Sequence, residues 1–135
     1  VNFGNRLELQ GYDLDKRVVR QGEQVTLTLH WMALREMERN YTISAQFIDD
    51  EQHKAAQLDG WPQGGAAPTS TWSLHQVVQD ERVLLVAPDA APGVYDVRLA
   101  VYTLDGAEFK LLSVIPEDGR MLADYVILTR VRVVE

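Results

Sequence analysis

Two tryptophans in the long connection between Leu58 and Gln76 are the side chains best suited to hold a ligand. Exposed, flat aromatic rings stack on the face of a pyranose, and neighbouring polar groups then fix the hydroxyls of the sugar. The stretch supplies both kinds of group, and its candidate ligand-binding residues are Trp61, Trp72, Asp59, Gln63, Thr69 and Ser70. A structural interpretation is also open, in which the connection crosses an open sheet and both indoles fill the core. We favour the structural interpretation, because a buried indole removes up to ~250 Å² from water.

The sequence contains no recognisable pattern of a catalytic or metal site. The histidines at positions 30, 53 and 75 lack a second ligand at the spacing of a helix-borne metal site, and the chain has no cysteine. There is no G-x-S-x-G turn, and Gly64-Gly65 is not followed by the Lys and helix of a phosphate loop. We therefore expect no enzyme, no catalytic residue, no metal and no cofactor. A glycosidase-like hydrolase stays open as a third hypothesis, since a facing pair of carboxylates is all that it requires.

The composition limits the partners that the chain can have. A net charge of −7 argues against nucleic acid and against docking on anionic lipid, because both rely on an excess of Lys and Arg. No apolar run approaches the ~20 residues that span a bilayer, so we expect no direct membrane insertion by this fragment. The chain begins with Val1 and not with Met, and residues 1–5 do not have the basic-then-apolar pattern expected of a signal peptide. We expect a single domain over residues 1–135 that has been excised from a longer protein.

A strand over residues 94–102 organises the predicted fold. It follows a Pro92-Gly93 turn, and side chains along an extended strand alternate between two faces. The buried face is predicted to consist of Tyr95, Val97, Leu99 and Val101. A tyrosine at this point of a strand is typical of the tyrosine corner of immunoglobulin-like sandwiches, where its hydroxyl bonds nearby backbone.

The same alternation predicts the remaining strands. They fall at about residues 6–12, 25–31, 41–47, 53–58, 77–86 and 125–134, with brief pairing at 18–19 and a strand or covering loop at 108–115. Trp31 is in register with three aliphatic residues and is expected at the centre of the core. In the last strand the inward side chains are predicted to be Tyr125, Ile127, Val131 and Val133. Residues 34–39 could make one helical turn, and reverse turns are expected at 49–51, at Asp105-Gly106 and at Pro116–Gly119.

These elements predict an all-β protein. Short strands separated by turn residues, without long helices, favour an immunoglobulin-like, two-sheet antiparallel sandwich of about seven to nine strands.

Four segments together resemble a known family: residues 3–12, the strand Val25–Trp31, the connection Gly60–Trp72 and the turn Pro92–Tyr95. In this order they are similar to an immunoglobulin-like sandwich domain found at the extracytoplasmic C-terminus of bacterial membrane glycosyltransferase-like proteins of the protein-mannosyltransferase type. The resemblance covers about residues 3–105, and Phe109 to Ala123 departs from it as an insertion. It implies a location on the extracytoplasmic side of a bacterial membrane. It supplies no catalytic residue, because the chemistry of that family lies in its membrane portion.

The first functional hypothesis is a non-enzymatic accessory module of a membrane-bound glycan-handling protein that contacts a saccharide. The alternative is a purely structural or protein–protein interaction domain that contacts a neighbouring domain of the parent protein or another copy. Exposure of Trp61 and Trp72 separates the two, since buried indoles favour the alternative.

Overall fold

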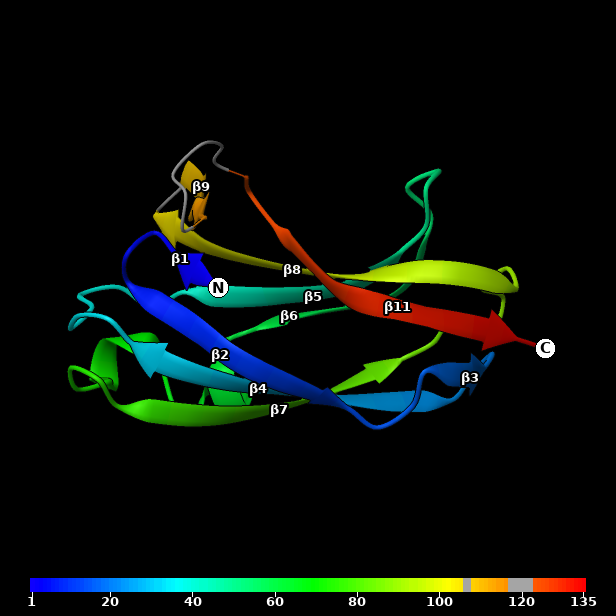
Figure 1. Ribbon diagram of the computed structural model, residues 1–135, viewed down its shortest axis with the longest axis horizontal. Helices are drawn as coiled ribbons and strands as arrows, with labels where there is room; N and C mark the ends of the chain where they lie inside the picture. Colours follow the sequence, from blue (N-terminus) through cyan, green and yellow to red (C-terminus); the bar gives the residue numbers. More distant parts are fainter. Residues whose placement is uncertain (106–107, 117–122) are drawn as a thin grey trace.

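The computed structural model describes residues 1–105, 108–116 and 123–135. These residues form two β-sheets that pack face to face (Figure 1). The first sheet has the strand order β10-β1-β2-β4-β7, with bounds Val114–Ile115, Asn2–Phe3, Leu7–Leu14, Gln24–Ala33 and Val77–Leu85. The second has the order β3-β11-β8-β5-β6, with bounds Val18–Arg20, Val126–Val134, Gly93–Asp105, Thr42–Ile48 and Lys54–Gly60. Its sixth strand, β9 (Glu108–Leu111), pairs with β8 only. The all-β sandwich predicted from the sequence is confirmed.

Strand β8, the strand predicted to organise the fold, lies at the centre of the six-stranded sheet. It pairs with β11 on one side and with β5 on the other, both antiparallel. Tyr95 is buried, and its hydroxyl donates to the carbonyl oxygen of Ala91 at 2.6 Å. The predicted tyrosine corner is therefore present. Burial, and then the charge of Asp49, raise the pKa of Tyr95 above its ordinary value.

One hydrophobic core lies between the sheets. Alternate residues of β4 and β8 point into it, and its largest fully buried side chains include Trp31, Phe3, Phe47 and Leu99. The Trp31 ring meets the Phe3 ring edge-on at 5.6 Å between centroids. Each such side chain contributes about 1.5–3 kcal/mol through its burial. Trp31 thus occupies the central position expected of it.

The prediction for the last strand is wrong in its first half. Val131 and Val133 are buried, but Tyr125 is 40% exposed and Ile127 is 47% exposed. The pairing of β11 with β8 shifts between Ile127 and Thr129, which marks a β-bulge at the residue between them. An extra residue reverses the alternation, so the side chains before it change face.

Three other local predictions can be compared with the structure. Residues 34–39 bend without forming a helix, so the predicted helical turn is wrong. The acidic turn at 49–51 is confirmed, since Asp49 Oδ1 accepts from the backbone N–H groups of Glu51 at 3.0 Å and His53 at 2.8 Å. The stretch 108–115 forms β9 and β10. The turns expected at Gly106 and at Pro116–Gly119 involve residues outside the described ranges.

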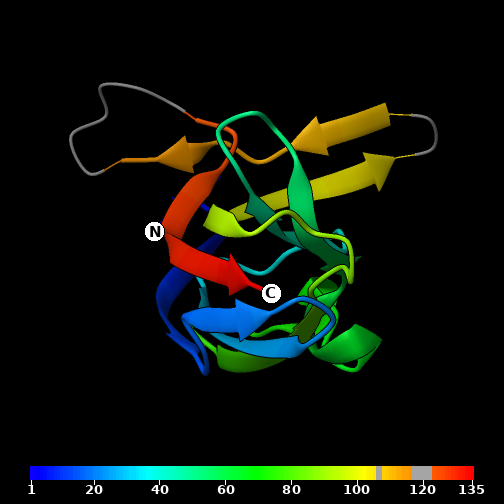
Figure 2. The same ribbon diagram turned by 90° about the vertical axis from the view of Figure 1, so that its right-hand side faces the viewer.

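The β8–β9 hairpin extends beyond the body of the sandwich (Figure 2). At the opposite end of the same sheet, the β5–β6 hairpin also rises from the outer face (Figure 1). Among the described residues, no helix has the length and hydropathy that crossing a bilayer requires.

Candidate functional site

The connection between β6 and β7 carries most of the candidate residues. It contains two short 3-10 turns, η1 (Pro62–Gly65) and η2 (Thr69–Thr71). Trp72, directly after η2, is only 2% exposed and donates from Nε1 to the carbonyl oxygen of Ala67 at 3.0 Å. This indole fills the core beneath the connection, as the structural interpretation expects. It presents no face to a ligand.

Thr69 and Ser70 fasten the connection to the neighbouring β4–β5 loop. Thr69 is fully buried; its Oγ1 donates to the carbonyl oxygen of Arg39 at 2.7 Å and accepts from the N–H of Tyr41 at 3.0 Å. The N–H of Ser70 donates to Asn40 Oδ1 at 3.0 Å. The Thr69 hydroxyl is thereby occupied with backbone groups, whereas the Ser70 side chain is exposed.

Trp61 has the opposite placement from Trp72. It directly follows β6 and is 42% exposed. It borders a hollow of about 310 Å³ whose other lining residues are Arg39, Asn40, Thr103 and Leu104. It also borders a smaller hollow of about 170 Å³ against Asp59, Gly64 and β7. Of the two indoles singled out by the sequence, Trp61 is the one that can meet a ligand.

A buried ion pair, which sequence reasoning missed, holds the backbone around Trp61. Asp80 and Arg82 of β7 are both buried, and their charged groups lie 2.7 Å apart. Arg82 Nη2 also donates to the carbonyl oxygens of Ile43 at 2.9 Å and Gly60 at 3.1 Å, which ties β7 to the opposite sheet. Asp80 Oδ1 accepts from the N–H of Gln63 at 2.7 Å. Because alternation along β7 points both residues inward, the period-two pattern could have identified them.

Gln63 has a left-handed backbone, with φ 54°. Its side-chain amide is already used within the protein. Its Nε2 donates to the carbonyl oxygen of Gln79 at 2.7 Å. Gln63 therefore fastens η1 to β7, and the structure brings it near Trp61 as part of the support of the connection.

Asp59 belongs to the outer face of the six-stranded sheet. Its carboxylate accepts from Ser44 Oγ at 2.8 Å, from Gln57 Nε2 at 3.1 Å and from the Tyr102 hydroxyl at 2.8 Å. Burial, followed by the hydrogen bond to Asp59, raises the pKa of Tyr102 above its ordinary value. The phenol is therefore protonated at neutral pH and holds the carboxylate in one orientation.

Aromatic side chains continue from Tyr102 along the β8–β9 hairpin. The Tyr102 and Phe109 rings lie 4.7 Å apart, and Phe109 pairs across the ladder with Leu104, which lines the larger Trp61 hollow. Phe109 is 56% exposed and Leu104 is 62% exposed. We call Asp59, Trp61, Tyr102, Leu104 and Phe109 together the Trp61 surface. Tyr102, Leu104 and Phe109 were not predicted as site residues, since only strand pairing brings them beside the β6–β7 connection.

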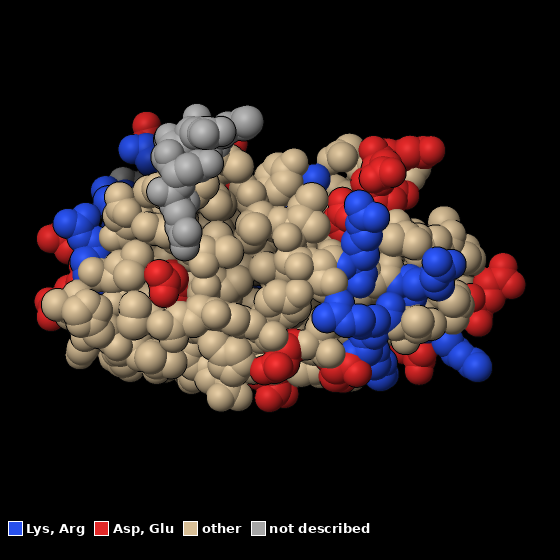
Figure 3. Space-filling view, viewed as in Figure 1, with Lys and Arg blue, Asp and Glu red and all other residues tan. Residues whose placement is uncertain are grey.

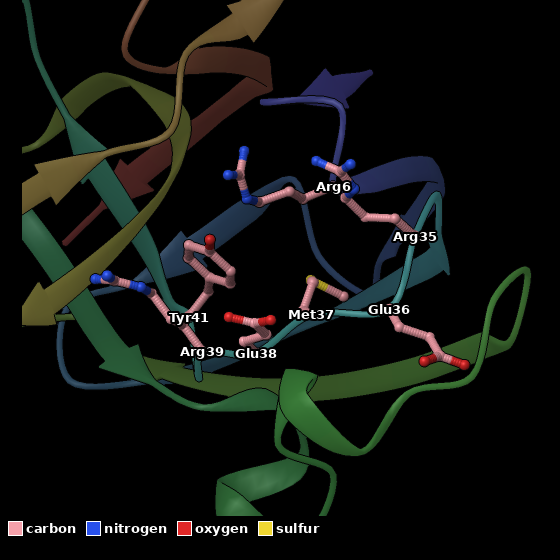
Figure 4. A pocket seen from close by; sticks show the side chains of 7 residues that line it. All are labelled: Arg6, Arg35, Glu36, Met37, Glu38, Arg39 and Tyr41. Atoms are coloured by element: carbon pink, nitrogen blue, oxygen red, sulfur yellow. The ribbon is translucent and has the colours of Figure 1, made fainter.

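A further hollow of about 310 Å³ lies at the loop end of the sandwich and is lined by Arg6, Arg35, Glu36, Met37, Glu38, Arg39 and Tyr41. Figure 4 shows the guanidinium groups of Arg6 and Arg35 on one side and the side chains of Glu38, Met37 and Tyr41 on the other. Arg6 donates to the carbonyl oxygen of Gly4 at 3.0 Å, whereas Arg35 and Glu38 are exposed. The lining mixes both signs of charge, and we assign no ligand to it.

The metal-binding side chains of the described residues are dispersed, since no group of three or more His, Asp or Glu could hold one ion. His30 contacts Asp13 at 2.8 Å on the outer face of the five-stranded sheet.

The fold class is thus a two-sheet β-sandwich. No family model matches the chain, and no curated protein matches it either. Among solved structures, the crystal structure of the C-terminal domain of Wzt is similar, with a TM-score of 0.62 and 9% sequence identity over 99% of this chain and 75% of that chain. At this identity the likeness shows the fold alone. The resemblance to mannosyltransferase-type proteins gains no sequence match and stays a prediction.

Proposed function

We propose that this chain is a non-enzymatic accessory module of a membrane-bound glycan-handling protein on the extracytoplasmic side of a bacterial membrane, and that it contacts a saccharide through the Trp61 surface. The observation that carries the proposal is the exposure of Trp61. Trp31 and Trp72 are almost completely buried, whereas Trp61 is 42% exposed beside a hollow. An indole that the fold leaves in water is available for stacking on a sugar ring.

The polar groups of the Trp61 surface suit the same ligand. Sugar sites combine aromatic faces with a few fixed hydrogen-bonding groups. Asp59 is held by three donors, so its carboxylate is positioned before any ligand arrives. Asn40 lines the hollow beside Trp61 and can supply an amide donor. The similarity to the C-terminal domain of Wzt supports the proposal only through the shared sandwich fold.

A fluorescence titration with a panel of neutral and acidic oligosaccharides tests the proposal. A binding glycan should change the emission of the exposed Trp61. Calorimetry, which does not depend on that fluorophore, should show that Trp61→Ala weakens binding by about fivefold or more, since stacking of a nucleic-acid base on one aromatic ring contributes ~1–3 kcal/mol and a sugar ring should contribute a similar amount. The matched control is Leu74→Ala, because Leu74 is 52% exposed in the same connection but lines neither Trp61 hollow.

A flat response across the whole panel would remove the saccharide and favour the alternative, a protein-interaction module. The edge strand β7 is the feature that favours this alternative. It pairs with β4 alone in its sheet, and Val77, Val83 and Leu85 on its outer face are 60%, 44% and 58% exposed. Exposed apolar residues on a strand edge are a surface for pairing with another chain.

A further inference from the structure

The outer face of the six-stranded sheet continues away from the Trp61 surface as three parallel rows of side chains. The register places Tyr102 beside Thr42 in the first row. The second row consists of Asp59, Ser44 and Ala100. The third consists of Gln57, Gln46, Arg98 and Ile127. In the middle row Ser44 and Ala100 have shorter side chains than Gln46 and Arg98, their neighbours in the third row.

This face is bounded at both ends. The β8–β9 hairpin rises at one end and the β5–β6 hairpin at the other (Figure 1). In Figure 3 acidic side chains gather at the end of this face that the β5–β6 hairpin forms, where the sequence has Asp49, Asp50 and Glu51. Along β8, Arg98 and Tyr102 are separated by about 13 Å at ~3.3 Å per residue, a length that suits a short oligosaccharide.

Arg98 is the unusual member of the third row. Its Nε is buried and has no hydrogen-bond partner among the described residues. The guanidinium carbon Cζ lies 4.0 Å from the centre of the Tyr125 ring, so the positive charge of Arg98 faces the π-electrons of that ring. The nearest acid on the strand, Asp96, pairs with Arg130 at 3.2 Å and not with Arg98. A guanidinium always carries its charge and offers five donors in a planar fork.

We propose that the saccharide bound by this face carries a carboxylate, as a uronic acid does, and that Arg98 binds this carboxylate; the inference rests on the proposed saccharide function. The planar fork of an arginine matches the two oxygens of a carboxylate in a bidentate pair. The contact with the Tyr125 ring helps to hold the guanidinium on this face before a ligand arrives. The neutral sugar units then lie over the middle row, towards Tyr102 and Trp61.

The overall charge restricts the ligand further. The chain has a net charge of −7, and Asp49, Asp50 and Glu51 stand at one end of the face. A field of this sign repels a dense polyanion. The proposed ligand is therefore an oligosaccharide in which isolated carboxylates alternate with neutral sugars.

The test uses an array of neutral, uronate-bearing, sulfated and phosphorylated glycans, with each uronate glycan also supplied in carboxyl-reduced form. The wild-type chain should bind uronate glycans best, and carboxyl reduction should weaken binding at least tenfold. Arg98→Gln should cause a similar loss for the uronate glycan and should bind both forms equally. Arg98→Lys, which keeps the charge but not the fork, should fall between them.

Arg130→Gln is the matched control, because it removes the same charge from the same face at a residue already paired with Asp96. Circular dichroism of each variant verifies folding. Preference for neutral, sulfated or phosphorylated glycans, or an equal effect of Arg98→Gln and Arg130→Gln, would overturn the carboxylate while leaving saccharide binding in place. Absence of binding to every glycan would overturn the proposed function itself, and this inference with it.

Discussion

The two indoles of the β6–β7 connection differ in burial because different contacts hold the backbone beside them. Trp72 follows η2, whose Thr69 is buried against the backbone of residues 39–41, so the chain is drawn inward there. Trp61 follows Gly60, whose carbonyl oxygen accepts from the buried Arg82. With the backbone fastened inward at Gly60, the next side chain points outward. Arg82 is therefore a positioning residue for the exposed indole.

Breaking the Asp80–Arg82 pair should strongly destabilise the protein. Arg82→Met leaves the Asp80 carboxylate buried without its cation, and we expect a loss of ~3–5 kcal/mol in the free energy of unfolding. The double variant Asp80→Asn/Arg82→Met should lose less than the single one, because a neutral amide still accepts from Gln63 and no charge is left uncompensated. Urea denaturation of the wild-type chain, of the two single variants Asp80→Asn and Arg82→Met, and of the double variant measures these differences in unfolding free energy.

Glu81→Gln serves as the control for that cycle. Glu81 lies between the two residues but is exposed, so its replacement should change stability by no more than about 0.5 kcal/mol. An Arg82→Met variant as stable as the Glu81→Gln variant would show that the ion pair does not hold β7 against the opposite sheet.

At the scale of elements, the alternation of side chains predicts the strands well and their irregularities poorly. Strands β4 and β8 bury the side chains that their period-two patterns indicate, whereas β7 also alternates but buries Asp80 and Arg82. The bulge in β11 has no local signature, because it depends on a partner in the other sheet. The Tyr12 hydroxyl, from β2, donates to the carbonyl oxygen of Leu128 at 2.9 Å, which is the residue at the bulge. Such a contact, distant in sequence, cannot be read from periodicity.

Replacing Tyr12 with Phe should weaken the bulge. The variant keeps the ring and loses one hydrogen bond between the sheets, so we expect a loss of ~1 kcal/mol in unfolding free energy. Amide hydrogen exchange should rise in residues 126–129 more than in residues 131–134, which lie beyond the bulge. If exchange along the whole of β11 equals that of the wild-type chain, the Tyr12 hydroxyl does not support the bulge.

At the scale of the whole molecule, the candidate site is shared among elements far apart in the sequence. The sequence indicates the β6–β7 connection as the place to look and identifies Trp61 and Asp59. The sequence alone does not identify Tyr102, Phe109 or Arg98 as site residues. Each lies in a strand with ordinary alternation, and only the pairing of the strands places it beside the others. The site is a property of the outer sheet face, and the face exists only after the strands have paired.

The two sheets are fastened to each other along both sides of the sandwich as well as through the core. Arg82 reaches from β7 to the backbone of β5 on one side, and Tyr12 reaches from β2 to β11 on the other. The core cluster between them draws on both sheets, with Leu29 and Trp31 from one and Val97 and Leu99 from the other. Neither sheet can keep its buried face if the other unfolds, so the sandwich should unfold as one cooperative unit.

Urea unfolding followed by two probes tests this cooperativity. In a Trp61→Phe variant, fluorescence reports on the buried Trp31 and Trp72, while far-ultraviolet circular dichroism reports on all strands of both sheets. We expect the two transitions to coincide, with one midpoint and one slope of about 1–3 kcal/mol per molar urea. In a Tyr12→Phe background both midpoints should move down together. A fluorescence transition that precedes the loss of circular dichroism would mean that the sheets separate before they unfold. The hydrogen bonds of Arg82 and Tyr12 between the sheets would then contribute little to holding the sandwich together.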